Sequence, residues 1–184
     1  MKLSIIIPVF NEARTILELL RRIGKVNLKG IKKEIILIDD ASTDGSREIL
    51  KKLKGKYIKI FHNKNQGKGA ALKTGIKVAT GDFIIFQDAD LEYNPRDYAK
   101  LLQPILDNKA NITLGSRFVN ERLVLFGKKR TMHSVHWFGN KFLTFVFNLL
   151  YGTNLTDAEP CYKMFKSKIL KNINVCQKMR KIYL

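Results

Sequence analysis

The chain has 184 residues, enough for one domain with a sizeable core, and its 45% hydrophobic and 10% aromatic content excludes an intrinsically disordered protein. It carries 34 lysine and arginine residues against 16 acidic ones, and the formal charge of +18 favours partners that bear phosphate, such as nucleic acid, nucleotides or an anionic membrane. A lysine-rich surface that only confers solubility explains the charge equally well at this stage.

Strand and helix patterns alternate along the first part of the chain. In order, we predict a strand at 4–9, a helix capped by Asn11, a strand at 34–39, a short helix ending at Leu53 and a strand at 57–61. There follow a helix at 70–79, a strand at 83–86, a helix that Pro95 opens and Pro104 breaks, and a strand at 112–114. This rhythm predicts an α/β fold with a mostly parallel, Rossmann-like sheet and helices on both faces.

The chain after Arg117 is basic and aromatic and lacks the strand–helix rhythm. We interpret it as an elaboration of the same domain. Its longest apolar stretch, 142–151, is too short to cross a bilayer, which takes about 20 residues. No signal peptide is expected, because the apolar run at 5–7 meets Pro8. Two cysteines, Cys161 and Cys176, have no metal-binding spacing and are expected to be reduced thiols of a cytosolic protein.

Two carboxylates one residue apart, Asp88 and Asp90, follow the apolar run at 83–86. Side chains just past the end of such a strand project into the crevice where open α/β sheets bind ligands. Their hard oxygens suit Mg²⁺ or Mn²⁺, and Glu92 could supply a third. Alone, the motif is weak, because an acidic loop after a strand is most often solvated and idle.

Other polar residues follow the neighbouring strands. The segment from Pro8 to Glu12, Asp39 and Asp40 reach the same sheet edge as the acids after residue 86, and Asp40 can accept hydrogen bonds from a base or a ribose. Turn and capping chemistry is the alternative for residues 39–46. In the loop that follows, Lys68 lies between two glycines and could reach a phosphate, although a simple loop explains it as readily.

An ordered set of motifs points to a family. The segments IIIPVFNE (5–12), DDASTDGS (39–46), NQGKGAALKTGIKVATGD (65–82), QDADLEYNP (87–95) and GSR (115–117) together resemble glycosyltransferase family 2, with its GT-A fold. The version at 87–95 and the later TDAEPCYKMF (156–165) are similar to polyprenyl-phosphate glycosyltransferases of the dolichyl-phosphate mannose synthase type. The resemblance covers residues 3 to 170, and the ordered set is far more specific than any one motif.

The resemblance implies a role for each matching residue. Pro8, Phe10, Glu12 and Asp40 would line the nucleoside pocket, with Asp39 and Lys68 as further nucleotide-binding residues. Asp88, Asp90 and Glu92 would hold Mg²⁺ or Mn²⁺ on the diphosphate of a nucleoside-diphosphate sugar. Arg117 and Arg130 would bind the phosphate of a polyprenyl acceptor, and Asp157 would lie near that acceptor as a catalytic residue beside Asp88 and Asp90. In this scheme residues 1–117 form the nucleotide-sugar half of a single domain, and residues 118–184 form the part that faces the acceptor and the membrane.

The sequence departs from the family pattern in two places. Cys161 stands where members usually have glycine. The family domain normally continues past residue 184 with basic, glycine-containing segments that close over the donor, so we expect a C-terminally shortened domain.

Residues 137–151 predict an amphipathic helix, with Phe138, Phe142, Phe145 and Leu149 at helical spacing. It could lie in a membrane interface, which would place the protein peripherally on the cytoplasmic face of the membrane. Packing on the protein's own sheet is the alternative. The expected activity is metal-dependent, inverting transfer of a hexose, from a GDP-mannose or UDP-glucose type of donor, to a polyprenyl phosphate.

Three alternatives remain at this stage. One is a family 2 enzyme with a soluble or saccharide acceptor, for which Asp157 would be the base; another is an inactive, shortened relative. A nucleic-acid-binding protein is disfavoured, because acids stand where phosphates would pass and no recognised binding module is present. The histidines, His62, His133 and His136, are expected to be surface or interfacial residues.

Overall fold

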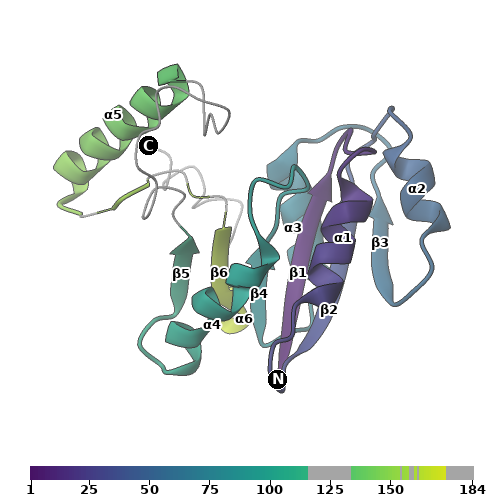
Figure 1. The fold of residues 1–184 in the computed structure, drawn as a ribbon, viewed down its shortest axis with the longest axis horizontal. Helices are drawn as coiled ribbons and strands as arrows, with labels where there is room; N and C mark the ends of the chain where they lie inside the picture. Colours follow the sequence, from purple (N-terminus) through teal and green to yellow (C-terminus); the bar gives the residue numbers. More distant parts are fainter. Residues whose placement is uncertain (116–133, 154, 158–159, 161, 173–184) are drawn as a thin grey trace. The chain divides into compact units, whose positions relative to one another are not determined.

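The computed structural model describes residues 1–115, 134–153, 155–157, 160 and 162–172 (Figure 1). They form two compact units: a sheet unit, Met1–Thr113 with the segment from Tyr162 onwards, and a second unit, Leu114–Cys161. The strands are β1 Lys2–Val9, β2 Lys32–Asp39, β3 Tyr57–Phe61, β4 Phe83–Phe86, β5 Ile112–Gly115 and β6 Tyr162–Lys166. The helices are α1 Ile16–Lys25, α2 Ser46–Lys52, α3 Lys68–Val78, the short 3₁₀ helix η1 Pro95–Asp97, α4 Tyr98–Leu106, α5 Ser134–Tyr151 and α6 Ser167–Asn172.

The strands form one sheet in the order β3-β2-β1-β4-β6-β5. Strand β1 pairs in parallel with β2 and β4, and β2 pairs in parallel with β3. Helix α1 lies in front of these strands and α3 behind them (Figure 1). The predicted α/β fold, with a mostly parallel sheet, is confirmed.

Helix α3 packs very closely on the sheet. A Cβ atom at Gly75 would lie 2.4 Å from Ile6 Cγ2 and 2.9 Å from Ile38 Cδ1, so only glycine fits there. Ile6, Ile38 and Ile76 belong to one buried cluster. Because both faces of β1 are covered, its apolar run is continuous instead of alternating, and Leu3, Ile5, Ile6 and Ile7 are fully buried.

Two boundary predictions are wrong. Asn11 does not cap α1, which begins at Ile16 after Thr15; it has a left-handed backbone with φ of 58°, and its Oδ1 accepts from Thr43 N at 2.8 Å. Asn11 therefore fastens the loop after β1 to the loop after β2. Pro104 does not break α4 but lies inside it. Its carbonyl accepts from Lys109 N at 2.9 Å, so the helix ends just after the proline.

Strand β6 was not predicted. It runs antiparallel to β4, with Met164 opposite Ile85 and Phe165 opposite Ile84. Tyr162 and Met164 are buried while Lys163 and Phe165 are half-buried, the alternation of a short strand. The chain therefore returns to the sheet unit after the second unit and supplies β4 with its outer neighbour.

In the second unit, α5 turns polar side chains inward. Asn140 and Thr144 are only 7% and 5% exposed, whereas Phe142 and Phe145 are 66% and 64% exposed. Asn140 Nδ2 donates to Asp157 Oδ1 at 3.2 Å, and Thr144 Oγ1 donates to Asn140 Oδ1 at 3.2 Å. Among the described residues, no helix combines the length and the apolar character that crossing a membrane requires.

Candidate functional site: an acidic pocket at the carboxyl edge of the sheet

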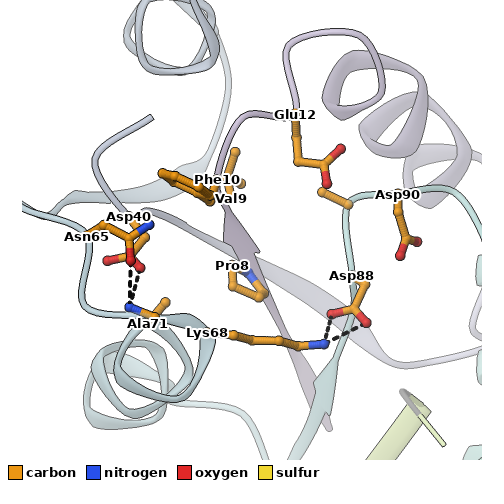
Figure 2. Close-up of a pocket in the computed structure, with 12 residues that line it drawn as sticks. Pro8, Val9, Phe10, Glu12, Asp40, Asn65, Lys68, Ala71, Asp88 and Asp90 are labelled. Carbon is orange, nitrogen blue, oxygen red and sulfur yellow. Dashed lines mark hydrogen bonds and ion pairs between the residues drawn. The ribbon is translucent and has the colours of Figure 1, made fainter. Parts of the chain in front are cut away.

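A pocket opens in the sheet unit where β1, β2 and β4 end (Figure 2). Its lining comes from three strand ends, from the loop that precedes α3 and from the first turn of α3: Pro8, Val9, Phe10, Glu12, Asp40, Asn65, Gly67, Lys68, Ala71, Asp88, Ala89 and Asp90. Backbone bonds beyond the strands bring these ends together, from Asp40 N to Val9 O at 2.8 Å and from Gln87 N to Ile6 O at 3.0 Å. The structure thus gathers at one edge most of the residues predicted to bind nucleotide and metal.

Asp88 and Asp90 form one wall of the pocket. Asp88 is ion-paired with Lys68, whose Nζ lies 2.6 Å from Oδ1 and 2.8 Å from Oδ2 (Figure 2). Asp90 is exposed, and its Oδ1 accepts from Glu92 N at 3.0 Å. Leu91 between them has φ of 66°, so the loop turns sharply and keeps Asp90 on the pocket side.

Gln87, which sequence reasoning missed, anchors this wall from beneath. Its fully buried Oε1 accepts from Tyr98 Oη and from Tyr162 Oη, both at 2.7 Å, and its Nε2 donates to the Asp88 carbonyl at 2.8 Å. Burial raises the pKa of both tyrosines, so they remain protonated donors. This network fixes the backbone that presents Asp88. A polar residue directly after an apolar strand was the available signal.

Asp40 lies on the opposite side of the pocket and is held by three donors. Gly67 N donates to Oδ2 at 2.7 Å, Gln66 N donates to Oδ1 at 3.0 Å, and His62 Nδ1 lies 2.7 Å from Oδ1. Burial alone would raise the pKa of Asp40, but the hydrogen bonds from His62, Gln66 and Gly67 hold it below its ordinary value. The carboxylate is therefore ionised at neutral pH and acts only as an acceptor.

His62 corrects the expectation of a surface or interfacial histidine. It is 8% exposed and bridges Asp40 to Thr74, whose Oγ1 lies 3.0 Å from Nε2. With Asp40 ionised, Nδ1 carries the proton, and Nε2 can accept from the threonine hydroxyl. No local sequence signal predicts this pairing, because the two residues follow different strands.

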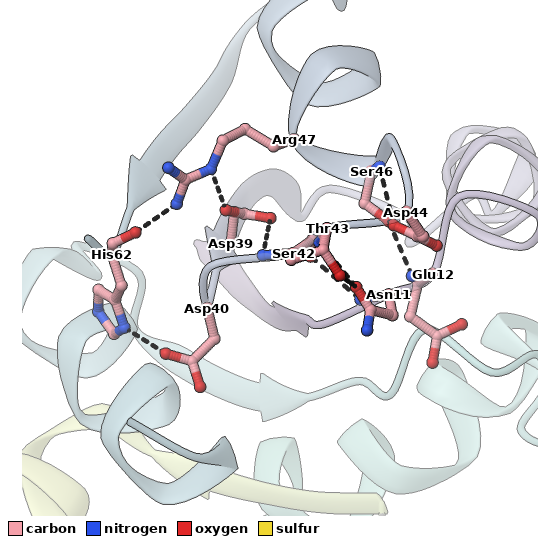
Figure 3. Close-up of polar contacts among 10 residues, drawn as sticks. All are labelled: Asn11, Glu12, Asp39, Asp40, Ser42, Thr43, Asp44, Ser46, Arg47 and His62. Carbon is pink, nitrogen blue, oxygen red and sulfur yellow. Dashed lines mark hydrogen bonds and ion pairs between the residues drawn. The ribbon is translucent and has the colours of Figure 1, made fainter. Parts of the chain in front are cut away.

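Asp39 is not among the residues that line the pocket, although it directly precedes Asp40. It is fully buried, accepts from Arg47 Nε at 2.6 Å, and the same guanidinium donates to the His62 carbonyl (Figure 3). These contacts tie α2 to the ends of β2 and β3. A nucleotide-binding role for Asp39 stays a prediction.

The loop from Ser42 to Ser46 has the turn chemistry expected of it. Asp44 Oδ1 accepts from Ser46 N at 3.0 Å, and Ser46 Oγ accepts from Glu12 N at 2.8 Å (Figure 3). The Glu12 carboxylate accepts from Thr15 Oγ1 at 2.5 Å. Glu12 is thereby positioned on the pocket wall by neighbours on both sides.

For four of the predicted residues the pocket lining gives no outcome. Asp157 lies in the second unit, 3% exposed and bonded to Asn140. Arg117 and Arg130 lie outside the described residues. Glu92 is exposed, and its role as a third metal ligand stays a prediction, because the described part of the chain has no group of three His, Cys, Asp or Glu placed to share an ion.

The donor set nevertheless fits a hard divalent cation. Asp88 and Asp90 both face the pocket, and Mg²⁺ and Mn²⁺ sites commonly use one or two carboxylates completed by substrate phosphates. Asp88 already presents both oxygens to a cation, the ammonium of Lys68. The arrangement therefore suits metal binding that a diphosphate completes.

The six-stranded sheet, mostly parallel in its pairing, belongs to a class of fold, the GT-A fold of glycosyltransferases, as a solved structure shows. The fold is shared with a solved mannosyltransferase from Pyrobaculum calidifontis in complex with GDP-Man and Mn²⁺, at a TM-score of 0.60 and 22% identity, covering 94% of this chain and 46% of that one. The chain belongs to glycosyl transferase family 2, whose family model matches residues 4–173. The predicted family is confirmed.

Curated relatives point the same way. The chain is 39% identical over 121 residues to a dolichol-phosphate mannosyltransferase of Pyrococcus furiosus, an overlap of 65% of this chain and 34% of that protein. It is 30% identical over 185 residues to a UDP-N-acetylglucosamine–dolichyl-phosphate N-acetylglucosaminyltransferase of Methanococcus voltae, covering 91% of this chain and 70% of the relative. The chain thus spans about a third of the first relative's length and most of the second's.

Proposed function

We propose that this protein transfers a hexose from a nucleoside diphosphate, of the GDP-mannose or UDP-glucose type, to a polyprenyl phosphate. The observation that carries the proposal is that Asp40 and the pair Asp88 and Asp90 line one pocket at the carboxyl edge of the sheet. In this proposal Asp40 accepts hydrogen bonds from the nucleotide base, and Asp88 and Asp90 hold the diphosphate through a metal ion in the same pocket. The names of the relatives from Pyrococcus furiosus and Methanococcus voltae support a lipid phosphate as the acceptor.

Each pocket residue has a task in this reaction. Asp40, kept ionised by its donors, accepts from N–H groups of the base, and Phe10, 47% exposed at the pocket, offers its ring to the nucleoside. Asp88 and Asp90 hold a Mg²⁺ or Mn²⁺ ion. When bound, this ion supplies charge neutralisation on the departing diphosphate.

The reaction itself needs little acid–base chemistry. An oxygen of the acceptor phosphate attacks the anomeric carbon in line, a new carbon–oxygen bond forms, and the bond to the diphosphate breaks with inversion. The acceptor phosphate is already ionised near neutral pH, so no strong general base is required. Arg117 and Arg130 are proposed to bind this phosphate, because guanidinium groups can clamp it with bidentate hydrogen bonds.

Helix α5 supports an acceptor held in a membrane. Its buried face carries Asn140 and Thr144, while Phe142, Phe145, Leu149 and Leu150 are between 64% and 72% exposed. A helix with its aromatic face outward can lie in the lipid interface. We therefore propose peripheral attachment to the cytoplasmic face of the membrane through α5.

A transfer assay tests the function. The protein is incubated with Mn²⁺, a panel of GDP- and UDP-sugars and a polyprenyl phosphate, and glycolipid product is separated from free sugar. We expect product from one nucleotide class, and none when EDTA is present. Transfer to a soluble saccharide in place of the lipid would contradict the acceptor and would favour a base such as Asp157.

A further inference from the structure

The Lys68–Asp88 ion pair crosses the pocket. Lys68 is the first residue of α3, and its side chain extends past Pro8 to Asp88 after β4 (Figure 2). Its ammonium lies 2.6 Å and 2.8 Å from the two carboxylate oxygens. Both oxygens of a proposed metal ligand are thus in contact with a cation from the chain itself.

An ion and the lysine compete for the same carboxylate. A divalent cation of the Mg²⁺ kind sits about 2.0–2.1 Å from its oxygen ligands, which would bring it into contact with an ammonium paired to both oxygens. Two cations at that separation repel strongly, so the ion can bind Asp88 only after Lys68 has moved away. Lys68 has room to make this movement, because its side chain is 55% exposed, whereas that of Asp88 is 13% exposed.

A displaced Lys68 needs another anion, and a diphosphate donor brings one to the same pocket. The residue begins an eleven-residue helix, whose amino-terminal end favours negative charge. Lys68 therefore gains a partner when a diphosphate arrives, at the moment when the ion takes over Asp88.

We propose that Lys68 is an internal counter-ion that keeps Asp88 from binding a metal ion until a nucleoside diphosphate draws the lysine away. This inference rests on the proposed function and adds a coupling to it: the metal ion and the nucleotide each strengthen the binding of the other. Since such coupling is reciprocal, it is measurable from either ligand. Lys68 is a positioning residue in this role, because it acts through Asp88.

Titration with Mn²⁺ alone tests whether Lys68 competes with the metal ion for Asp88. The free ion is counted by its electron paramagnetic resonance signal in wild type, Lys68→Met and Lys68→Arg. Losing a partly exposed ion pair should raise the Mn²⁺ affinity of Lys68→Met about fivefold, and Lys68→Arg, which keeps the charge, should resemble wild type. Lys77→Met is the matched control, since Lys77 is exposed on the same helix and does not line the pocket.

The same titrations with saturating GDP or UDP test the coupling. In wild type the nucleotide should strengthen Mn²⁺ binding, and in Lys68→Met this gain should shrink about fivefold, because the Mn²⁺ affinity rises by that factor without nucleotide and stays the same with nucleotide. Circular dichroism confirms that each variant is folded.

The possible outcomes distinguish a failure of the Lys68 proposal from a failure of the proposed function. If Lys68→Met binds Mn²⁺ no more tightly than Lys77→Met, or if its coupling to nucleotide equals that of wild type, Lys68 does not guard Asp88, while metal-dependent nucleotide binding by the wild type would still stand. If no protein binds Mn²⁺ with or without nucleotide, the inference and the metal site fall together.

Discussion

The sheet unit and helix α5 sort their side chains in opposite ways. In the sheet, Ile5 and Ile7 are fully buried, and the charged groups meet at an open edge. On α5, Asn140 and Thr144 are buried, whereas Leu149 is 72% exposed. Burial of apolar surface is favourable in water, so the outward apolar face of α5 agrees with the proposed contact with lipid. The comparison supports two separate binding surfaces, which are the proposed donor pocket in the sheet unit and the proposed lipid-binding face of α5.

The largest effect is expected from Asp90→Ala, which should impair the donor pocket and leave membrane binding unchanged. Removing one of two proposed ligand carboxylates should weaken Mn²⁺-dependent GDP or UDP binding at least about a hundredfold, since metal sites supply several kcal/mol. Asp90 is exposed and loses one hydrogen bond, to Glu92 N, so the fold should persist. Calorimetry with Mn²⁺ measures the affinity.

Glu48→Ala is the matched control for this variant, because it removes one acidic charge from an exposed position on α2, away from the pocket lining. It should bind nucleotide like wild type, and both variants should sediment with vesicles as wild type does. Equal nucleotide affinity in Asp90→Ala and wild type would contradict the metal site.

Membrane binding through α5 should be weakened by the double substitution Phe142→Ser and Phe145→Ser. Full burial of a phenylalanine ring contributes about 1.5–3 kcal/mol, and a ring in the lipid interface is buried only in part, so the double variant should lose at least about tenfold in binding to anionic vesicles while nucleotide binding is unchanged. Co-sedimentation measures the loss. Leu17→Ser is the control, because Leu17 is also exposed, at 52%, but lies on α1. A double variant that unfolds, or a wild type that never sediments, would contradict the proposed contact of α5 with the membrane.

A smaller effect, on stability alone, is expected at Glu34 near the start of β2. Burial would raise the pKa of Glu34, but hydrogen bonds from Ser4, Thr80 and Lys2 lower it to about 2. A depressed folded-state pKa adds stability that is complete above the ordinary value of 4.5 and is lost as the pH falls towards 2.

Glu34→Gln should therefore reduce the free energy of unfolding by about 2 kcal/mol at pH 7 and by much less near pH 2.5. Urea denaturation at the two pH values measures the difference. Nucleotide and vesicle binding at pH 7 should both stay as in wild type. An equal loss of stability at both pH values would mean that the effect comes from packing and not from the carboxylate charge.

The sequence predicted the sheet and its acidic edge because both depend on local signals. Apolar runs of strand length mark β1, β2 and β4, and parallel strands separated by helices must end at one edge. Asp40 and Asp88 could therefore be placed together from their positions alone. The family motifs then gave these acids their proposed tasks.

The parts that the sequence did not predict depend on partners distant along the chain. Gln87 meets Tyr162, 75 residues away, and His62 meets Asp40, 22 residues away. Asn11 adopts a left-handed backbone because Ser42 and Thr43 satisfy it, a choice that no local propensity reveals. The inward face of α5 has the same character, since the buried amide of Asn140 donates to Asp157, 17 residues away.

The position of Tyr162 has a consequence for how the protein is made. Strands β1 to β4 leave the ribosome first and can pair with one another, but the outer neighbour of β4 and one of the two hydroxyls on Gln87 come from beyond Leu114–Cys161. The Asp88 loop can reach its final shape only after this whole segment has been translated. A ribosome stalled before Tyr162 would therefore hold a nascent chain with most of its sheet in place and an unfinished pocket wall.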